Sequence, residues 1–380
     1  MKICNKCIYD ENVPNIVFND DGICNYCEQI VTLEKKYQTG NKQGIKSLDV
    51  IIKKIKKNYK HKKYDCVIGV SGGTDSSYMM LKAIEWGLRP LAVHYDNTWN
   101  TSIATENIRK VTSKLNIDLH TYVIDNKESD DIFRSFFIAG VPEFDASTDL
   151  ALAQVLRMVA AKYKIKYILE GHSFKAEGVS PQGNNYFDGK YIKDIHGKFG
   201  KIKMKTYPLM SLYQFLKWTI IYRQKFIRPF WYIEYSKPNA REELIKKTGW
   251  EYYGGHHLEN RATAFAHKIY LPKKFNIDHR NWSLSAEVRS GILERNKALK
   301  IYNKPIKDDP ELVEYAKKRM SLNDDEYDEV FNGINYTYKD YKTYKKTFEY
   351  LRFLFFILSK FNLVPLSFYL KYCFPDKAKS

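Results

Sequence analysis

The sequence lacks an apolar run long enough to cross a membrane as a helix, which takes about 20 residues. The nearest candidate is residues 351–374, which is interrupted by Arg352, Lys360, Asn362, Pro365 and Lys371. This pattern predicts one or two amphipathic helices that pack on the protein's own core or on a second subunit. Peripheral contact with a membrane surface is the alternative. Nothing resembles a signal peptide, so we expect a cytoplasmic protein.

Cysteine is also scarce, with six in 380 residues, yet four of the six are paired in the first 30 positions. Cys4 and Cys7 form one C-x2-C pair, and Cys24 and Cys27 form another. The spacing is typical of a structural zinc site with four thiolate ligands. Disulfides and an iron–sulfur cluster are the alternatives. Disulfides are disfavoured because no secretory signal is visible and the other two cysteines are isolated.

Acidic residues are outnumbered, with 44 Asp and Glu against 62 Lys and Arg, which gives a formal net charge of +18. Such an excess suits an anionic partner: nucleic acid, a nucleotide sugar or an acidic membrane surface. Lys, Ile, Asn and Tyr are abundant throughout the chain, so the charge alone does not select nucleic acid.

No Walker A sequence is present, but another glycine-rich loop follows the short apolar run 66–70 and precedes a helix-like segment at 78–86. Strand, turn and helix in this order direct backbone N–H groups at a phosphate. The loop consists of Ser71, Gly72, Gly73, Thr74, Asp75, Ser76 and Ser77. The carboxylate of Asp75 would suit a bridging Mg²⁺. This order resembles the PP-loop ATP-pyrophosphatase family, which cuts ATP between its α- and β-phosphates.

Strand and helix patterns then alternate along the chain. Strands are expected at 66–70, 90–95, 119–124 and 167–170, and helices at 102–115 and 149–162. This alternation predicts an α/β fold with a parallel sheet that carries helices on both faces. The predicted organisation is zinc knuckles over 1–30, a helical linker over 31–62, a PP-loop ATP-binding domain over 63–235 and a helical substrate or partner region over 236–380.

Polar residues follow the ends of these strands, where ligands bind in parallel sheets. His94 and Asp96 end one strand, and Gly171 and His172 follow another, so all four are candidates for ATP binding. Glu177 lies six residues after Gly171. This spacing resembles the ammonia-dependent NAD synthetase branch of the PP-loop families and implies that Glu177 is a second Mg²⁺ ligand. Pro208-Leu209 also resembles that branch, with Lys203 and Lys205 nearby for phosphate.

A glycine- and histidine-rich segment at 249–261 is the last informative cluster. The residues suited to an anionic sugar are Tyr253, Gly254, Gly255, His256, His257, Glu259 and Arg261. Histidine can also move protons near neutral pH. The alternative is a loop that caps the following helix, with Glu259 paired to Arg261.

These features together resemble the N-acetyl sugar amidotransferases of bacterial surface-glycan synthesis, including the pseudaminic-, legionaminic-acid and O-antigen enzymes. The shared features are the two cysteine pairs, the SGGTDSS loop, HYDN at 94–97, EGH at 170–172 and WEYYGGHHLENR…YLPKKFNID from residue 250. The resemblance covers nearly the whole chain and is weakest over 211–235 and after 345. The family usually has Lys before the second His and Tyr-Glu-Ser after it, whereas this chain has His256-His257-Leu258-Glu259-Asn260.

The resemblance implies an enzyme that uses ATP, Mg²⁺ and a structural Zn²⁺ to convert an acetamido group into an acetamidine. Ser71, Asp75 and Glu177 would serve the adenylation step. No cysteine lies at the first residue positions, so ammonia is expected from a separate glutaminase subunit, delivered with a cyclase-type partner. The alternative is a tRNA-thiolating PP-loop enzyme, which also joins zinc knuckles to this loop but needs further reactive cysteines.

Overall fold

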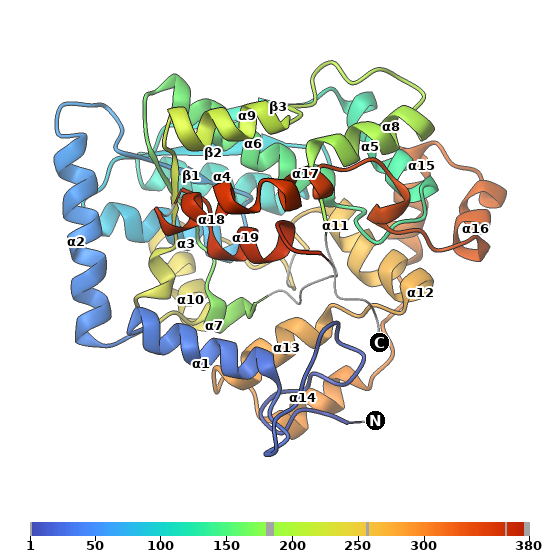
Figure 1. The fold of residues 1–380 in the computed structure, drawn as a ribbon, viewed down its shortest axis with the longest axis horizontal. Helices are drawn as coiled ribbons and strands as arrows, with labels where there is room; N and C mark the ends of the chain where they lie inside the picture. Colours follow the sequence, from blue (N-terminus) through green and yellow to red (C-terminus); the bar gives the residue numbers. More distant parts are fainter. Residues whose placement is uncertain (1, 180–185, 256–257, 362, 376–380) are drawn as a thin grey trace.

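The computed structural model describes residues 2–179, 186–255, 258–361 and 363–375. Its centre is one parallel sheet in the order β3-β2-β1-β4-β5 (Figure 1). The strands are β1 Cys66–Gly69, β2 Pro90–Asp96, β3 Leu119–Val123, β4 Tyr167–Leu169 and β5 Lys225–Ile227. The α/β class and the parallel sheet predicted from the sequence are therefore confirmed.

Helices surround the sheet and make up most of the chain after it. Up to the last strand they are α1 Asn25–Tyr37, α2 Lys42–Asn58, α3 Thr74–Glu85, α4 Ser102–Lys114, α5 Asn126–Ile138, α6 Ala146–Lys162, α7 Phe174–Glu177, α8 Gly189–Phe199, α9 Leu212–Leu216 and the π-helical η1 Lys217–Ile221. Beyond it are η2 Pro229–Trp231, α10 Lys237–Thr248, α11 Arg261–Phe265, η3 Ala266–Tyr270, α12 Leu271–Phe275, α13 Arg280–Arg289, α14 Arg295–Tyr302, α15 Pro310–Met320, α16 Asp324–Asn332, η4 Tyr338–Asp340, α17 Lys345–Tyr350, α18 Arg352–Lys360 and α19 Leu366–Tyr372.

The order of the strands creates the position for a ligand. The chain moves outward from β1 through β2 to β3, and then returns to place β4 on the other side of β1. Because such crossovers are right-handed, α6 covers the face opposite to α3 and α4. The carboxyl ends of β1 and β4 are neighbours at this change of direction, which is where open parallel sheets bind ligands.

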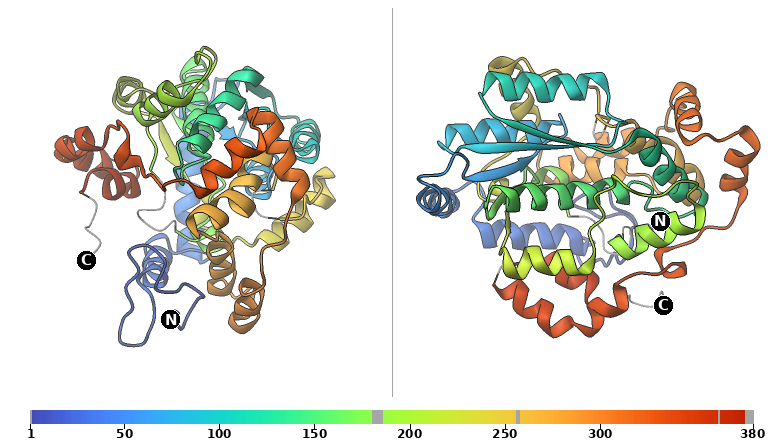
Figure 2. Two further views of the ribbon diagram at one scale, coloured as in Figure 1. Left: turned by 90° about the vertical axis from the view of Figure 1, so that its right-hand side faces the viewer. Right: turned by 90° about the horizontal axis from the view of Figure 1, so that it is seen from above.

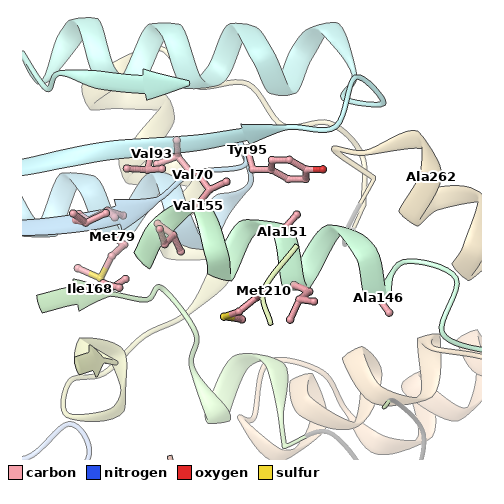
Figure 3. Packing of buried hydrophobic residues seen from close by; sticks show 14 of the residues in the cluster. Val70, Met79, Val93, Tyr95, Ala146, Ala151, Val155, Ile168, Met210 and Ala262 are labelled. Carbon is pink, nitrogen blue, oxygen red and sulfur yellow. The ribbon is translucent and has the colours of Figure 1, made fainter. Parts of the chain in front are cut away.

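The central strands β1, β2 and β4 are buried on both faces of the sheet and are therefore continuous apolar runs rather than alternating ones. Val93 of β2 and Ile168 of β4 pack between Met79 of α3 and Val155 of α6 (Figure 3). The same cluster continues through Ala262 and into the C-terminal helices. The hydrophobic core thus crosses the domain boundary predicted at residue 235.

The N-terminal cysteine segment lies beside the helices α13 and α14, at the lower edge of Figure 1. In the other direction, α17, α18 and α19 form an outer layer that lies against α9 and η1 (Figure 2). Among the described residues, no helix is both long and apolar enough to span a bilayer.

Candidate ATP and metal sites

The glycine-rich loop leaves β1 and ends at the first turn of α3. Gly72 has a φ of +80°, and a Cβ there would lie 2.2 Å from the carbonyl oxygen of Ala104. Only glycine satisfies both the left-handed backbone and the close approach of α4. Trp250 Nε1 donates to the Gly72 carbonyl at 2.9 Å, which fixes the loop from the other side. The N–H groups of the first turn of α3 are thereby left to face a ligand.

A cavity of about 180 Å³ opens over this turn. It is lined by Ser71, Gly73, Thr74, Asp75, Ser76, Gly171, His172, Glu177, Lys237, Arg241, Tyr253, Gly255 and Glu259. Gly171 is required by space, because a Cβ there would come within 2.5 Å of the Asp75 carbonyl oxygen. Ser77 is fully buried and does not line the cavity. The structure thus gathers the loop, the end of β4 and the segment near residue 255 around one space.

Asp75 and Glu177 each form an ion pair with the same lysine, Lys237. Lys237 Nζ lies 3.1 Å from Asp75 Oδ2 and 3.3 Å from Glu177 Oε1. The hydroxyl of Tyr235 donates to the other Asp75 oxygen. Burial raises the pKa of Asp75, but the Lys237 ammonium and the Tyr235 hydrogen bond outweigh it and leave the pKa below its ordinary value. Asp75 is therefore ionised at neutral pH.

This donor set fits Mg²⁺. The ion prefers hard oxygen ligands and is commonly held by one or two carboxylates together with phosphate oxygens. Asp75 lies on the first turn of α3 and Glu177 ends α7, so both carboxylates face the same space at the strand ends. The ammonium of Lys237 supplies the positive charge between them in this structure.

His172 lies beside this pair in its neutral form. Burial lowers the pKa of His172 to about 3, and the nearby Arg228 acts in the same direction. Trp231 Nε1 donates to His172 Nδ1 at 3.2 Å, so the ring proton is on Nε2. Nε2 is 3.6 Å from Glu177 Oε2. The neutral histidine therefore lies beside Glu177 without adding charge to the pair.

His94 and Asp96 lie at the end of β2 but do not line the cavity. His94 Nδ1 bonds the Val70 carbonyl at 2.8 Å, and Asn100 Nδ2 lies 3.2 Å from the other ring nitrogen. Asp96 accepts from the backbone N–H of Thr98 at 2.8 Å. The His94 contact holds the strand end that precedes the loop, and the Asp96 contact holds the turn that follows β2. A direct role of His94 and Asp96 in ATP binding stays a prediction.

The segment around residue 255 closes one side of the cavity. Tyr253, Gly255 and Glu259 line it, and Gly254 has a φ of +94°. Arg261 Nη groups turn elsewhere, because its guanidinium lies over the Tyr315 ring at 4.5 Å. His256 and His257 lie outside the described residues. The predicted sugar segment is therefore part of the same site as the phosphate loop.

Three cavity or near-cavity residues were missed by the reasoning from sequence: Tyr235, Lys237 and Arg241. Lys237 and Arg241 are four residues apart at the start of α10, so they share one helix face. Ser236 and Pro238 mark that helix start in the sequence, which was the available signal. Conversely, Lys203 and Lys205 are exposed and lie away from the lining of the cavity.

The four N-terminal cysteines form the second site. Their sulfur atoms lie within 4.8 Å of one another, with Cys4–Cys27 and Cys7–Cys24 separations of 3.9 Å. Sulfurs bound at about 2.3 Å to a tetrahedral zinc are about 3.8 Å apart, so the cluster fits Zn²⁺. All four are fully buried, which leaves no open position for a catalytic water.

Two arginines connect this cluster to the rest of the chain. Arg289, the last residue of α13, approaches Cys27 Sγ at 4.0 Å, and Arg295 of α14 donates to the carbonyl oxygens of Cys4 and Cys7. The same α13 packs on α7, where Ser290 Oγ donates to the Lys175 carbonyl at 2.5 Å. One helix thus borders both the zinc site and the element that ends in Glu177.

The two other cysteines offer no reactive thiol. Cys66 lies on β1, and Cys373 follows α19; both are fully buried. Burial raises the pKa of the Cys66 thiol well above its ordinary value and that of Cys373 to about 11. Sulfur-transfer chemistry needs an accessible thiolate, so these residues do not supply what a tRNA-thiolating enzyme would need.

The fold and site define an α/β protein with a glycine-rich loop between β1 and α3 and an N-terminal four-cysteine cluster. Residues 259–354 match the family described as "LPS biosynthesis protein WbpG-like, C-terminal domain". Over these residues the chain is therefore similar to that domain, in agreement with the family resemblance seen in the sequence. The match begins at Glu259, a residue of the cavity.

Two individual proteins are also similar. "Uncharacterized protein MJ1599" of Methanocaldococcus jannaschii is 29% identical over 172 residues, which are 44% of this chain and 58% of that protein. The chain thus spans little more than half of that relative. The NMN synthetase structure from Francisella tularensis aligns with 80% of this chain and 94% of its own, at 14% identity and a TM-score of 0.31. Similarity this low has no bearing on activity.

Proposed function

We propose that the chain is an ATP-dependent amidotransferase that converts the N-acetyl group of a bacterial surface-glycan sugar into an acetamidine. One observation carries the proposal. Asp75 and Glu177 meet at a phosphate-type loop, and the residues that close the cavity, Tyr253 and Glu259, lead directly into the WbpG-like domain. This arrangement supports one site that joins nucleotide chemistry to the glycan-biosynthesis domain.

The cavity is suited to the phosphate end of ATP. Its volume of about 180 Å³ is below the roughly 300–1,000 Å³ of a pocket that encloses a whole ligand. The first turn of α3, together with Lys237 and Arg241, offers N–H groups and cations to a polyphosphate. Mg²⁺ held by Asp75 and Glu177 would neutralise charge on the departing pyrophosphate.

The reaction needs positioning more than covalent help from the protein. The acetamido oxygen attacks the α-phosphorus, the bond to the β-phosphate oxygen breaks, and pyrophosphate leaves with the electron pair. Ammonia then adds to the imidate carbon, the C–O bond to AMP breaks, and a proton is released as the amidine forms. Lys237 and Arg241 would stabilise the charge that develops on the phosphates, because both line the cavity.

The ammonia source is proposed to be a partner glutaminase, delivered with a cyclase-type subunit. In the sugar half of the site we assign Tyr253, Gly254, Gly255, Glu259 and Arg261, together with His256 and His257 from outside the described residues. Of these, Tyr253, Gly255 and Glu259 line the cavity. The sugar itself is an acetamido sugar, either nucleotide-linked or a nonulosonic acid.

The decisive experiment incubates the full chain with Mg-ATP, ammonium at alkaline pH and a set of acetamido sugars. We expect AMP, pyrophosphate and a sugar amidine detected by mass spectrometry. Formation of ADP, or no amidine with any sugar while tRNA is thiolated, would overturn the proposal. Glutamine in place of ammonium should give no product without a partner, and turnover with glutamine alone would refute the need for a separate glutaminase.

A further inference from the structure

The outer face of the C-terminal helices is apolar, and it carries aromatic side chains that are largely exposed. On α18 and the turn after it, Phe353 is 76% exposed and Phe361 67%, while Tyr350 at the end of α17 is 89% exposed. The inner face of the same helices packs on the core through Phe355 and Leu358. The helices are thus amphipathic, and only one of their two apolar faces is used by the fold.

A second element extends this surface. Phe215 of α9 contacts the rings of Phe355 and Phe368, so α9 and η1 lie directly beside α18 and α19. Tyr213 of α9 and Ile221 of η1 are 71% and 69% exposed. We name the two parts together the apolar face: Tyr213, Ile221, Tyr350, Phe353, Phe356, Phe361, Leu366 and Leu370. In Figure 2 the helices α17, α18 and α19 form an outer layer beside α9.

The charges around this face are almost all positive. From residue 195 to residue 233 the sequence contains no Asp or Glu, and from 341 to 375 it contains only Glu349. That one acid is already occupied, since Lys345 Nζ lies 3.7 Å from Glu349 Oε1. The exposed cations of these segments are Arg223, Lys346, Arg352 and Lys360, and Arg352 and Lys360 lie over the rings of Phe374 and Phe356.

We propose that the apolar face docks peripherally on a membrane surface rich in anionic lipid. Aromatic and aliphatic side chains would enter the interface, while the surrounding cations would meet lipid phosphates. A second copy of the chain fits less well, because a two-fold contact through this face would bring the same cations together without acids to pair them. The absence of a membrane-spanning helix from the described residues agrees with a peripheral contact.

The test uses the full chain in flotation assays with two kinds of vesicle: phosphatidylcholine alone, and phosphatidylcholine with phosphatidylglycerol. Binding is expected only to the anionic vesicles and should weaken as salt is raised. Phe353→Ser with Phe361→Ser should lower binding at least tenfold, because two large apolar side chains no longer insert. Their matched control is Val17→Ser with Ile334→Ser, which removes equally exposed apolar groups elsewhere.

The charge arm compares Arg352→Gln with Lys360→Gln against Lys54→Gln with Lys57→Gln on α2. Each cation removed from the face should weaken vesicle binding about fivefold, the ratio that ~1 kcal/mol per charge gives. All substituted side chains are exposed, so circular dichroism and melting temperature should not change. The α2 variants should bind as the unaltered chain does.

Three results would overturn the proposal. The first is no binding to anionic vesicles. The second is equal loss in the face variants and their controls, which would indicate a diffuse effect of net charge. The third is a dimer seen by light scattering that the Phe353 and Phe361 variants convert to monomer, which would make a second copy the occupant.

Discussion

The four-cysteine cluster and the carboxylate pair of the cavity are both suited to a metal ion, but they are organised differently. In the cluster, four fully buried sulfurs face one another, and an arginine stands outside them. In the cavity, Asp75 and Glu177 face a lysine that lies between them. The first arrangement needs an ion to hold it closed, whereas the second already contains a positive charge. The cysteine cluster is thus suited to a structural ion, and the carboxylate pair to an ion that exchanges.

The largest effect should follow from breaking the cysteine cluster. Cys24→Ser, or chelation of the unaltered chain, should unfold the N-terminal segment, because the binding energy of structural zinc is folding energy, on the order of 10 kcal/mol. Metal analysis should give about one zinc per chain before the change and none after it. Cys373→Ser removes a buried thiol outside the cluster, and this control variant should still contain about one zinc per chain. Iron, or a metal-free folded chain, would contradict the assignment.

The next effect tests the carboxylate pair. Asp75→Asn should preserve the fold but slow pyrophosphate release by a factor on the order of a hundred to a thousand, because a ligand that stabilises charge in the transition state is lost. Glu85→Gln, on the same helix but outside the cavity, is the control and should have little effect. Activity of the Asp75 variant within about threefold of the unaltered chain would show that Asp75 holds no metal.

The third prediction concerns Glu143, a buried carboxyl that is hydrogen-bonded by tyrosine residues rather than by a lysine. Glu143 is hydrogen-bonded by Tyr191 and Tyr186, and burial raises its pKa from an ordinary 4.5 to about 7. Because the folded-state pKa is the higher one, its contribution to stability is complete below pH 4.5 and is lost as pH rises through 7. That loss is on the order of 3 kcal/mol.

Glu143→Gln should remove this part of the pH dependence, measured by urea unfolding at several pH values between acid and neutral. Glu314→Gln, an exposed acid, should leave the pH dependence unchanged. An unaltered slope in the Glu143 variant would mean that Glu143 remains ionised, as Asp75 is, and the contrast between the two buried carboxyls would disappear.

The smallest effect concerns the charge outside the cysteine cluster. Arg289 approaches Cys27 Sγ, and partners of this kind typically change metal affinity by about tenfold or more. Arg289→Gln should therefore weaken zinc binding by about tenfold in a chelator competition, with the stoichiometry retained. Lys297→Gln, on an exposed position of α14, is the matched control. Equal affinities in the two variants would show that the guanidinium does not stabilise the thiolates.

Local patterns were sufficient for much of the fold. The strands expected at 90–95, 119–124 and 167–170 are β2, β3 and β4 within a residue or two. For β2 and β4 the reason is that buried parallel strands are short apolar runs bounded by polar turns. The helix α5, Asn126–Ile138, was missed even though Asp125 caps it. The strand β5 was missed as well: it has three residues, all half-buried, and the segment around it resembles the family least.

The sites show the same limit. The loop 71–77 and Gly171 could be found because each follows a strand end, and the cysteines because of their spacing. Glu177 could be found because its spacing from Gly171 resembles that of a known family. Lys237 could not be assigned in this way, since its role depends on two carboxylates that are 162 and 60 residues away: 237 − 75 and 237 − 177. The approach of the segment near residue 255 to the phosphate loop is likewise a tertiary contact. The sequence therefore predicts which residues lie at a strand end, but not which distant helix will pack against that end.

The position of α13 and α14 has a consequence for the newly made chain. The four cysteines are translated well before the helices that cover Ile8 and contact Cys4 and Cys7, which follow only at residues 280–302. The position of Glu177 also depends on α13, because α7 packs on that helix. In the nascent chain the four cysteines are thus complete long before the helix that supports the carboxylate site has been made.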